Sequence, residues 1–226
     1  MTEHGFDPAG VERRTSLLDS IPDDDPDLRS DRSYYDRILD AYADMRSSTR
    51  AIILSKPSEG RLLFLALLSD VIFFLARCIS MVVLPPEELR FELPTYIGLG
   101  LFLAFLFRTS LFYVFAMVAH VVSKPFGGAG TWYKTRCAVF WAALVSAPVE
   151  VFGAVVTVAV VTLREELPFL GADWLIEAPY FIGPIAFGFF LSAGVAEAQG
   201  FRYTYRVMAV LAILTIATIW GLLSIS

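Results

Sequence analysis

The stretch that decides the fold is CAVFWAALVSAPVEVFGAVVTVAVVTL, residues 137–163. Glu150 is its only charged residue, and the stretch is far longer than the 3–10 residues that are usual for a β-strand. Spanning about 30 Å of hydrocarbon takes about 20 helical residues, and in lipid a helix satisfies its own backbone polar groups. The stretch therefore predicts a membrane-spanning helix.

Four further stretches have the same character, at residues 62–84, 96–121, 174–198 and 205–225. The connections between them are short, which favours antiparallel neighbours. The 226-residue chain is 56% hydrophobic and 18% charged, with a mean hydropathy of +0.61. An ordinary globular domain is about 45–50% apolar and roughly 25% charged. We therefore expect an all-α membrane protein in which residues 57–226 form a five-transmembrane-helix bundle.

The N-terminal part of the chain is polar instead. Residues 1–61 hold 13 acidic and 9 basic residues, and nothing at their start has the pattern of a cleavable signal peptide. Residues 1–30 have an acidic cluster and no apolar periodicity, which predicts a disordered tail rather than a calcium loop. Residues 31–56 are expected to form an amphipathic cytoplasmic helix and linker. That helix would lie on the membrane, dock a cytoplasmic partner, or pack on the protein's own loops.

Basic residues predict the orientation of the bundle. Nine of them precede the first span or lie in the second and fourth connections: Arg46, Arg50, Lys56, Arg61, Lys124, Lys134, Arg136, Arg202 and Arg206. The alternate connections hold only Arg90 and Arg164. Because basic loops stay cytoplasmic, we expect a multi-pass protein of the plasma membrane, or of the inner membrane in a prokaryote. Its N-terminus would be cytoplasmic, and its C-terminus would lie on the opposite side.

Four ionisable residues inside the expected spans are candidate site residues: Arg108, Glu150, Asp70 and Arg77. Each costs about 2.5–3.5 kcal/mol on insertion scales, so each needs a partner or a function. Arg108 and Glu150 lie at matched depth on faces with small residues at every fourth position, which predicts an ion pair between them. That pair would either fix helix packing or form an ion, proton or polar-ligand site beside Pro148.

The other charged residues of the spans have no evident partner in the sequence. Asp70 and Arg77 are seven residues apart, about 10 Å along a helix, so they are not expected to pair with each other. Arg77 can extend toward the membrane surface. Glu177 and Glu197 lie at the two ends of the fourth span, where solvation at the interface is the expectation.

Residues with recognisable catalytic chemistry are missing. The sequence has no HExxH, CxxC, GxSxG or Walker A motif, and its only histidines are His4 and His120. Cys78 and Cys137 fit packed thiols better than metal or disulfide chemistry. We therefore expect no enzyme, no catalytic residue, no cofactor and no metal, and the net charge of −5 does not suggest nucleic acid as a partner.

The second connection supplies a further set of candidates, which share a glycine-rich turn and the helix start after it: Gly127, Gly128, Gly130, Trp132, Lys134 and Arg136. A flexible turn with ordinary positive charge is favoured here. The alternative is that Lys124, Lys134 and Arg136 bind lipid phosphates.

These features together resemble the Yip family of Ypt/Rab-GTPase-interacting membrane proteins, in a prokaryotic branch. The resemblance covers residues 50–226. It rests on the loop Pro125-Phe126-Gly127-Gly128-Ala129-Gly130-Thr131-Trp132, on Pro148 in the third span, and on Ala196-Glu197-Ala198-Gln199-Gly200-Phe201 before the fifth. Family membership would imply a membrane adaptor or organiser without catalysis, which contacts GTPases through its cytoplasmic face and assembles with other members.

We therefore expect a non-enzymatic adaptor whose partners are membrane lipid and unidentified proteins, in a homo- or hetero-oligomer. The alternative is a small channel or transporter that uses Arg108, Glu150 and Asp70. An odd number of spans cannot form two equal inverted halves, which counts against this alternative.

Overall fold

The computed structural model describes residues 33–83, 93–164, 166, 172, 174, 175 and 178–223. Every regular element in these ranges is helical. Four helices are long and apolar enough to cross a membrane: Glu59–Val83, Ile97–Phe126, Trp132–Leu163 and Pro179–Gln199. The prediction of an all-helical, multi-pass protein is thereby confirmed. The expected tail at 1–30, Arg90 and Glu177 lie outside the described residues.

The elements follow one another with short connections. In chain order they are α1 (Tyr34–Ala43), α2 (Met45–Leu54), α3 (Glu59–Val83), α4 (Leu93–Leu103), the π-helical turn η5 (Ala104–Arg108), α5 (Thr109–Ser123), the 3-10 turn η6 (Lys124–Phe126), α6 (Trp132–Leu163), α8 (Pro179–Gln199) and α9 (Thr204–Leu223). The fifth expected span corresponds to α9, of which Thr204–Ile213 counts as a shorter apolar helix.

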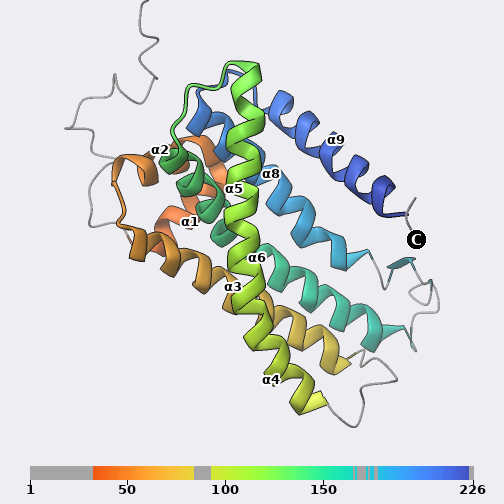
Figure 1. Cartoon of the computed structure of the whole chain (residues 1–226). Coiled ribbons are helices and arrows are strands. Elements are labelled where there is room, and N and C mark those ends of the chain that lie inside the picture. Colours follow the sequence, from red (N-terminus) through yellow and green to blue (C-terminus); the bar gives the residue numbers. More distant parts are fainter. Residues whose placement is uncertain are drawn as a thin grey trace, which may run out of the picture.

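The long helices form a layer in the order α3, α6, α8 and α9, and the continuous α4–α5 helix crosses in front of it (Figure 1). One end of the bundle collects α1, α2, the loop at 124–131 and the connection at 200–203. We call this end the loop face. α3, α6 and α9 start at the loop face, whereas α5 and α8 end there.

The centre of the bundle is the first half of α6. Every residue from 137 to 147 is buried, including the large side chains of Phe140 and Trp141. α3, α5, α8 and the α1–α2 segment all contact α6, so this half of the helix is covered on all sides. A helix that is hydrophobic all round is expected in such a central position.

The closest approach of α6 to α8 occurs at two glycines. A Cβ added to Gly153 would lie 2.9 Å from the carbonyl oxygen of Pro179, and a Cβ added to Gly183 would overlap the Glu150 carboxylate. Small residues permit such close helix packing. The sequence pattern predicted a small-residue face on the span that forms α6 but did not single out these two positions.

The segment at 31–56 forms two helices rather than one. Asp44 separates them: its backbone N–H donates to the Asp40 carbonyl at the end of α1, and its side chain accepts from the backbone N–H groups of Arg46 and Ser47 at the start of α2. An aspartate that caps the first turn of a helix in this way satisfies donors that have no partner inside the helix.

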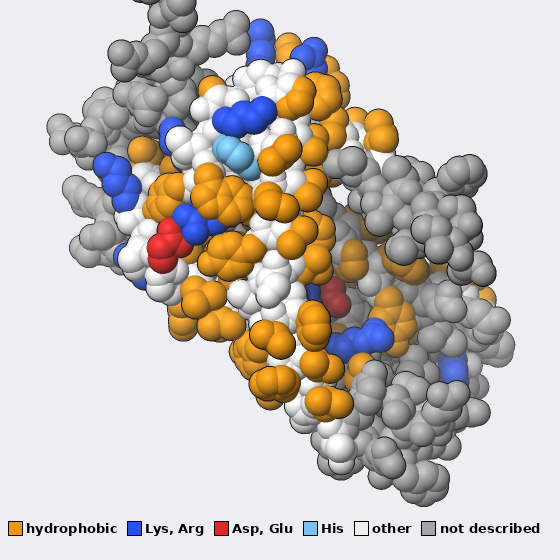
Figure 2. Space-filling view, viewed as in Figure 1, with side chains coloured by type: hydrophobic (Ala, Val, Ile, Leu, Met, Phe, Trp, Pro, Cys, Tyr) orange, Lys and Arg blue, Asp and Glu red, His pale blue; other side chains and the backbone are white. Residues whose placement is uncertain are grey.

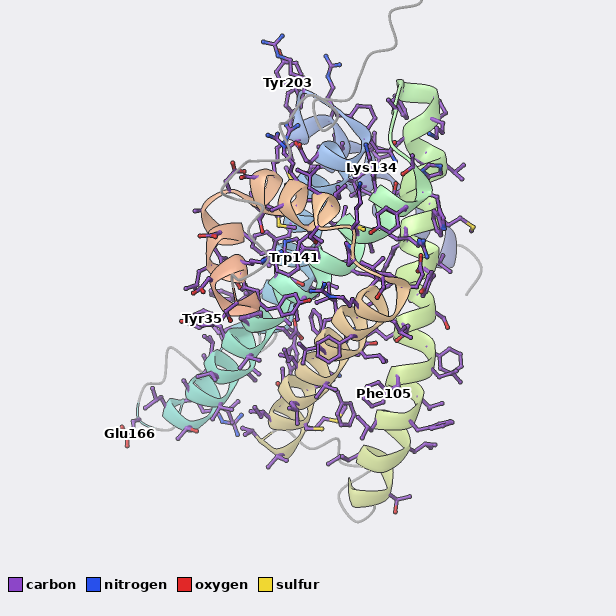
Figure 3. All side chains as sticks on the ribbon, turned by 90° about the vertical axis from the view of Figure 1, so that its left-hand side faces the viewer. Tyr35, Phe105, Lys134, Trp141, Glu166 and Tyr203 are labelled. Atoms are coloured by element: carbon purple, nitrogen blue, oxygen red, sulfur yellow. The ribbon has the colours of Figure 1, made fainter. Side chains whose placement is uncertain are left out.

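Both short helices pack on the protein itself, as one of the three expected alternatives requires. The Trp141 indole donates to Ser48 Oγ at 3.0 Å, and the Tyr42 hydroxyl donates to the Val145 carbonyl at 2.8 Å, in the turn that precedes Pro148. Burial raises the pKa of Tyr42 above its ordinary value. A tyrosine hydroxyl is protonated at neutral pH even without that shift, so it can donate this bond. In Figure 3, Trp141 lies where the short helices meet α6, and Tyr35 lies at the outer edge of α1.

Candidate functional site

Asp70 is the most deeply buried charged residue of the interior, with 1% of its surface exposed. It belongs to the buried stripe of α3, in which Leu62, Ala66, Phe73 and Ala76 recur at helical spacing. Its Oδ2 accepts a 2.8 Å hydrogen bond from the Thr109 hydroxyl. The structure thus gives Asp70 the partners that the sequence did not reveal.

Arg108 pairs with Asp70, at 3.3 Å between Nε and Oδ1. The contact lacks hydrogen-bond geometry, so Oδ1 remains a buried acceptor without a donor. The Arg108 guanidinium carbon also lies 3.7 Å from the centre of the Phe73 ring. Arg108 ends the π-helical turn η5, and such turns occur frequently at functional sites.

Glu150 does not form the expected ion pair with Arg108, and that prediction was wrong. Its carboxylate fills the space beside Gly183 of α8, and it interacts at longer range with the charges of Arg108 and Arg77. The Arg77 guanidinium lies over the Tyr180 ring, 5.4 Å from its centre.

The four candidates therefore gather between α3, α5, α6 and α8. Asp70, Arg108 and Glu150 lie 11, 15 and 18 residues from the loop-face ends of their helices, about 17–27 Å at the helical rise. Figure 2 shows acidic and basic side chains inside a recess beside α5. Two carboxylates and two guanidinium groups thus meet at a depth where a membrane would exclude water. Such a cluster can hold helices together or bind a small ion or proton.

A second polar centre lies at the loop face around Glu197. Its side chain is 3% exposed and forms ion pairs with Arg46 (Nε–Oε2, 3.0 Å) and Arg50 (Nε–Oε1, 2.8 Å) of α2. Arg46 also donates to the carbonyls of Phe201 and Arg202, at 2.7 and 2.9 Å. The expectation of interfacial solvation for Glu197 was wrong, because α2 covers the end of α8 and supplies both counter-charges.

The glycine-rich loop packs against the same end of α8. Gly127 has a φ of +85°, a conformation that favours glycine, and it ends the turn η6. The Gly130 N–H donates to Gln199 Oε1 at 3.1 Å, and a Cβ at Gly130 would overlap the Ala198 carbonyl. At Gly128 a Cβ would come within 2.8 Å of Gln199 Oε1. The loop is therefore a close-packed joint between α5, α6 and α8, rather than an open turn.

The remaining loop candidates lie in the first turns of α6 and connect it to α3 and α5. Arg136 forms a two-point ion pair with Glu59, at 2.7 and 2.6 Å, and its guanidinium carbon lies 5.4 Å from the centre of the Trp132 ring. Trp132 in turn packs edge-on against His120. The Lys134 backbone N–H donates to Thr131 Oγ1, the N-cap of α6. Arg136 is therefore held by Glu59 rather than presented to lipid phosphate.

The chain matches no protein-family model, no curated protein and no solved structure. Within the described ranges, no three His, Cys, Asp or Glu side chains come together as a metal site would require. Function therefore has to be inferred from the geometry of the two polar centres, and the Yip resemblance stays a prediction.

Proposed function

We propose that this chain is a non-enzymatic integral membrane organiser of the Yip type, with its loop face in the cytoplasm and α1–α2 presented as a fixed docking platform. The observation that carries the proposal is the clamp of Arg46 and Arg50 on the buried Glu197. It holds the platform on the spans, while Tyr35 and Leu39 of α1 remain 68% and 50% exposed. Large apolar side chains that stay exposed on a fixed surface suit protein recognition.

The length of α9 supports a fifth crossing, and the positions of the basic residues support the proposed orientation. α9 has 20 residues, about 30 Å of helix, which is the thickness of a bilayer core. The basic residues Lys124, Arg202 and Arg206 all belong to loop-face segments, as the positive-inside rule requires of a cytoplasmic face. Five crossings would then place the C-terminus on the other side.

The test of docking uses photo-crosslinking in cells. A photoreactive residue at position 35 or 39 should give a discrete crosslink to another protein or to a second copy of the chain. The same residue at position 203, an exposed tyrosine of the loop face outside α1, is the matched control. Identical crosslink patterns at the three positions would refute the platform. Equal accessibility of tags at both chain ends to an impermeant reagent would refute the five crossings.

The second candidate function is a small channel or transporter. It is favoured by the interior cluster, where Asp70 has an acceptor oxygen without a donor and Arg108 ends a π-helical turn. Protein reconstituted into liposomes would then carry protons or small ions, and Glu150→Gln would abolish the flux. Equal flux in wild type and Glu150→Gln would exclude a role of this carboxylate in transport.

A further inference from the structure

An apolar groove runs between α5, α8 and α9 at the loop face. It has a volume of about 370 Å³. Val118 and Val122 of α5 line one wall, Val207 and Val210 of α9 line the other, and the buried Val195 of α8 lies between them. Its polar lining is confined to few side chains, so its walls suit a hydrocarbon chain.

The position of the groove indicates that it opens toward the membrane. Its lining on α9 begins at Tyr205, next to the loop-face end of the helix, and continues for about 9 Å along the helix to Leu211. The end of α5 and the start of α9 lie close together at the loop face, and the two helices diverge away from it (Figure 1). A groove between two diverging membrane helices is open to the lipid molecules of the adjacent bilayer leaflet.

Positive charge gathers at the end of the groove that would meet lipid headgroups. Arg206 belongs to its lining, and the guanidinium carbons of Arg202 and Arg206 lie 5.3 and 5.4 Å from the centre of the Tyr203 ring. No carboxylate in the described part of the chain forms an ion pair with either arginine. The nearby Glu197 is already neutralised by α2.

Lys124, at the end of α5, is a third cationic residue near the groove. Lys124 directly follows the last residue of α5, and its Nζ bonds only backbone carbonyl oxygens among the described residues, Gly128 O at 3.5 Å and Gly130 O at 2.8 Å. In Figure 2, Lys and Arg side chains gather at the end of α5, above a surface that is mostly hydrophobic. An apolar groove with a cationic end is complementary to a lipid with an anionic headgroup.

We propose that this groove binds one anionic phospholipid, with an acyl chain between α5 and α9 and the phosphate at Arg206 and Arg202. The proposal rests on the membrane embedding and orientation proposed above. Each basic residue near an anionic lipid surface strengthens binding by about fivefold. The groove would therefore prefer phosphatidylglycerol to phosphatidylcholine, because only the first carries net negative charge.

The test measures lipid retained by the full chain. The protein is reconstituted with equal amounts of phosphatidylglycerol and phosphatidylcholine, extracted in mild detergent, and its bound lipids are counted by native mass spectrometry. Arg206→Gln should lower the ratio of the two lipids by about fivefold. Arg164→Gln, which removes one charge at the opposite end of α6, should leave the ratio unchanged.

A second pair of variants tests the groove itself. Val118→Trp should displace the retained lipid because the indole would fill the groove, whereas Val121→Trp should not, because Val121 is 60% exposed and does not line the groove. Unchanged lipid ratio in Arg206→Gln, or equal retention in the two tryptophan variants, would overturn the proposal. So would a crosslink from position 118 to a protein chain instead of lipid. Loss of the lipid site would leave crosslinking at positions 35 and 39 intact, so the two proposals fail separately.

Discussion

Removing the two arginines that bind Glu197 should destabilise the protein more than replacing Glu197 with glutamine. The Glu197 side chain is 3% exposed, whereas those of Arg46 and Arg50 are 29% and 36% exposed. After Glu197→Gln, both guanidinium groups can turn toward water. After Arg46→Met and Arg50→Met together, a buried carboxylate loses both counter-charges and cannot reach water without moving α2.

The structure sets the expected magnitudes. An uncompensated buried charge costs about 3–5 kcal/mol, so the double arginine variant should lose that much free energy of unfolding. Glu197→Gln keeps the shape of the side chain and gives up charge-assisted hydrogen bonds, at a cost of about 1.5–3 kcal/mol. The triple variant, with Arg46→Met, Arg50→Met and Glu197→Gln, contains no unpaired charge at this centre. It should therefore recover part of the free energy of unfolding that the double arginine variant loses.

The measurement is a denaturation titration in detergent micelles, followed by circular dichroism. Arg164→Met is the control, because this exposed arginine at the far end of α6 lies outside both the Glu197 centre and the proposed lipid groove. The control should stay within about 0.5 kcal/mol of wild type. Equal losses in the double variant and in Glu197→Gln would refute the reasoning, since they would show that the carboxylate reaches water without its arginines.

Three further variants test the interior packing. Gly183→Ala places a Cβ on the Glu150 carboxylate and should cost about 1–3 kcal/mol of unfolding free energy. In a Glu150→Ala background, which removes this carboxylate, the same substitution should cost much less in the same titration. Gly130→Ala would push the loop off the Ala198 carbonyl, so limited proteolysis should cut at 124–131 faster than in wild type. Asp70→Asn leaves Arg108 without its charged partner and should cost about 3–5 kcal/mol of unfolding free energy. A loss no larger than that of a variant at an exposed site would show that the ion pair is not desolvated.

The spans were predictable from sequence because lipid leaves the backbone few options. A stretch such as 137–163 must be helical in hydrocarbon, and the observed Trp132–Leu163 differs mainly by one further turn at its polar start. The alternation of basic residues also predicted which helix ends lie together. Arg136 with Glu59 and Gly130 with Gln199 join the ends that were expected on one side.

The partners inside the bundle were harder to predict. Arg108 and Glu150 have matching depths, but the rotation of each helix about its axis decides which side chains meet, and the π-helical turn at Ala104–Arg108 alters that rotation. Asp70 therefore takes the position expected for Glu150. Glu197 was misjudged for another reason: its counter-charges come from a segment about 150 positions earlier in the chain, which no local pattern reveals.

The same separation has a consequence for biosynthesis. Arg46 and Arg50 leave the ribosome early, yet their acceptor on α8 is made 151 and 147 residues later. Throughout that interval the apolar sides of α1 and α2, with Met45, Ile52 and Ile53, have no finished bundle to cover them. In the proposed orientation, the N-terminal segment stays on the ribosome's side of the membrane until α8 has been translated. Its packing on α8 can then occur only after the preceding helices have been made.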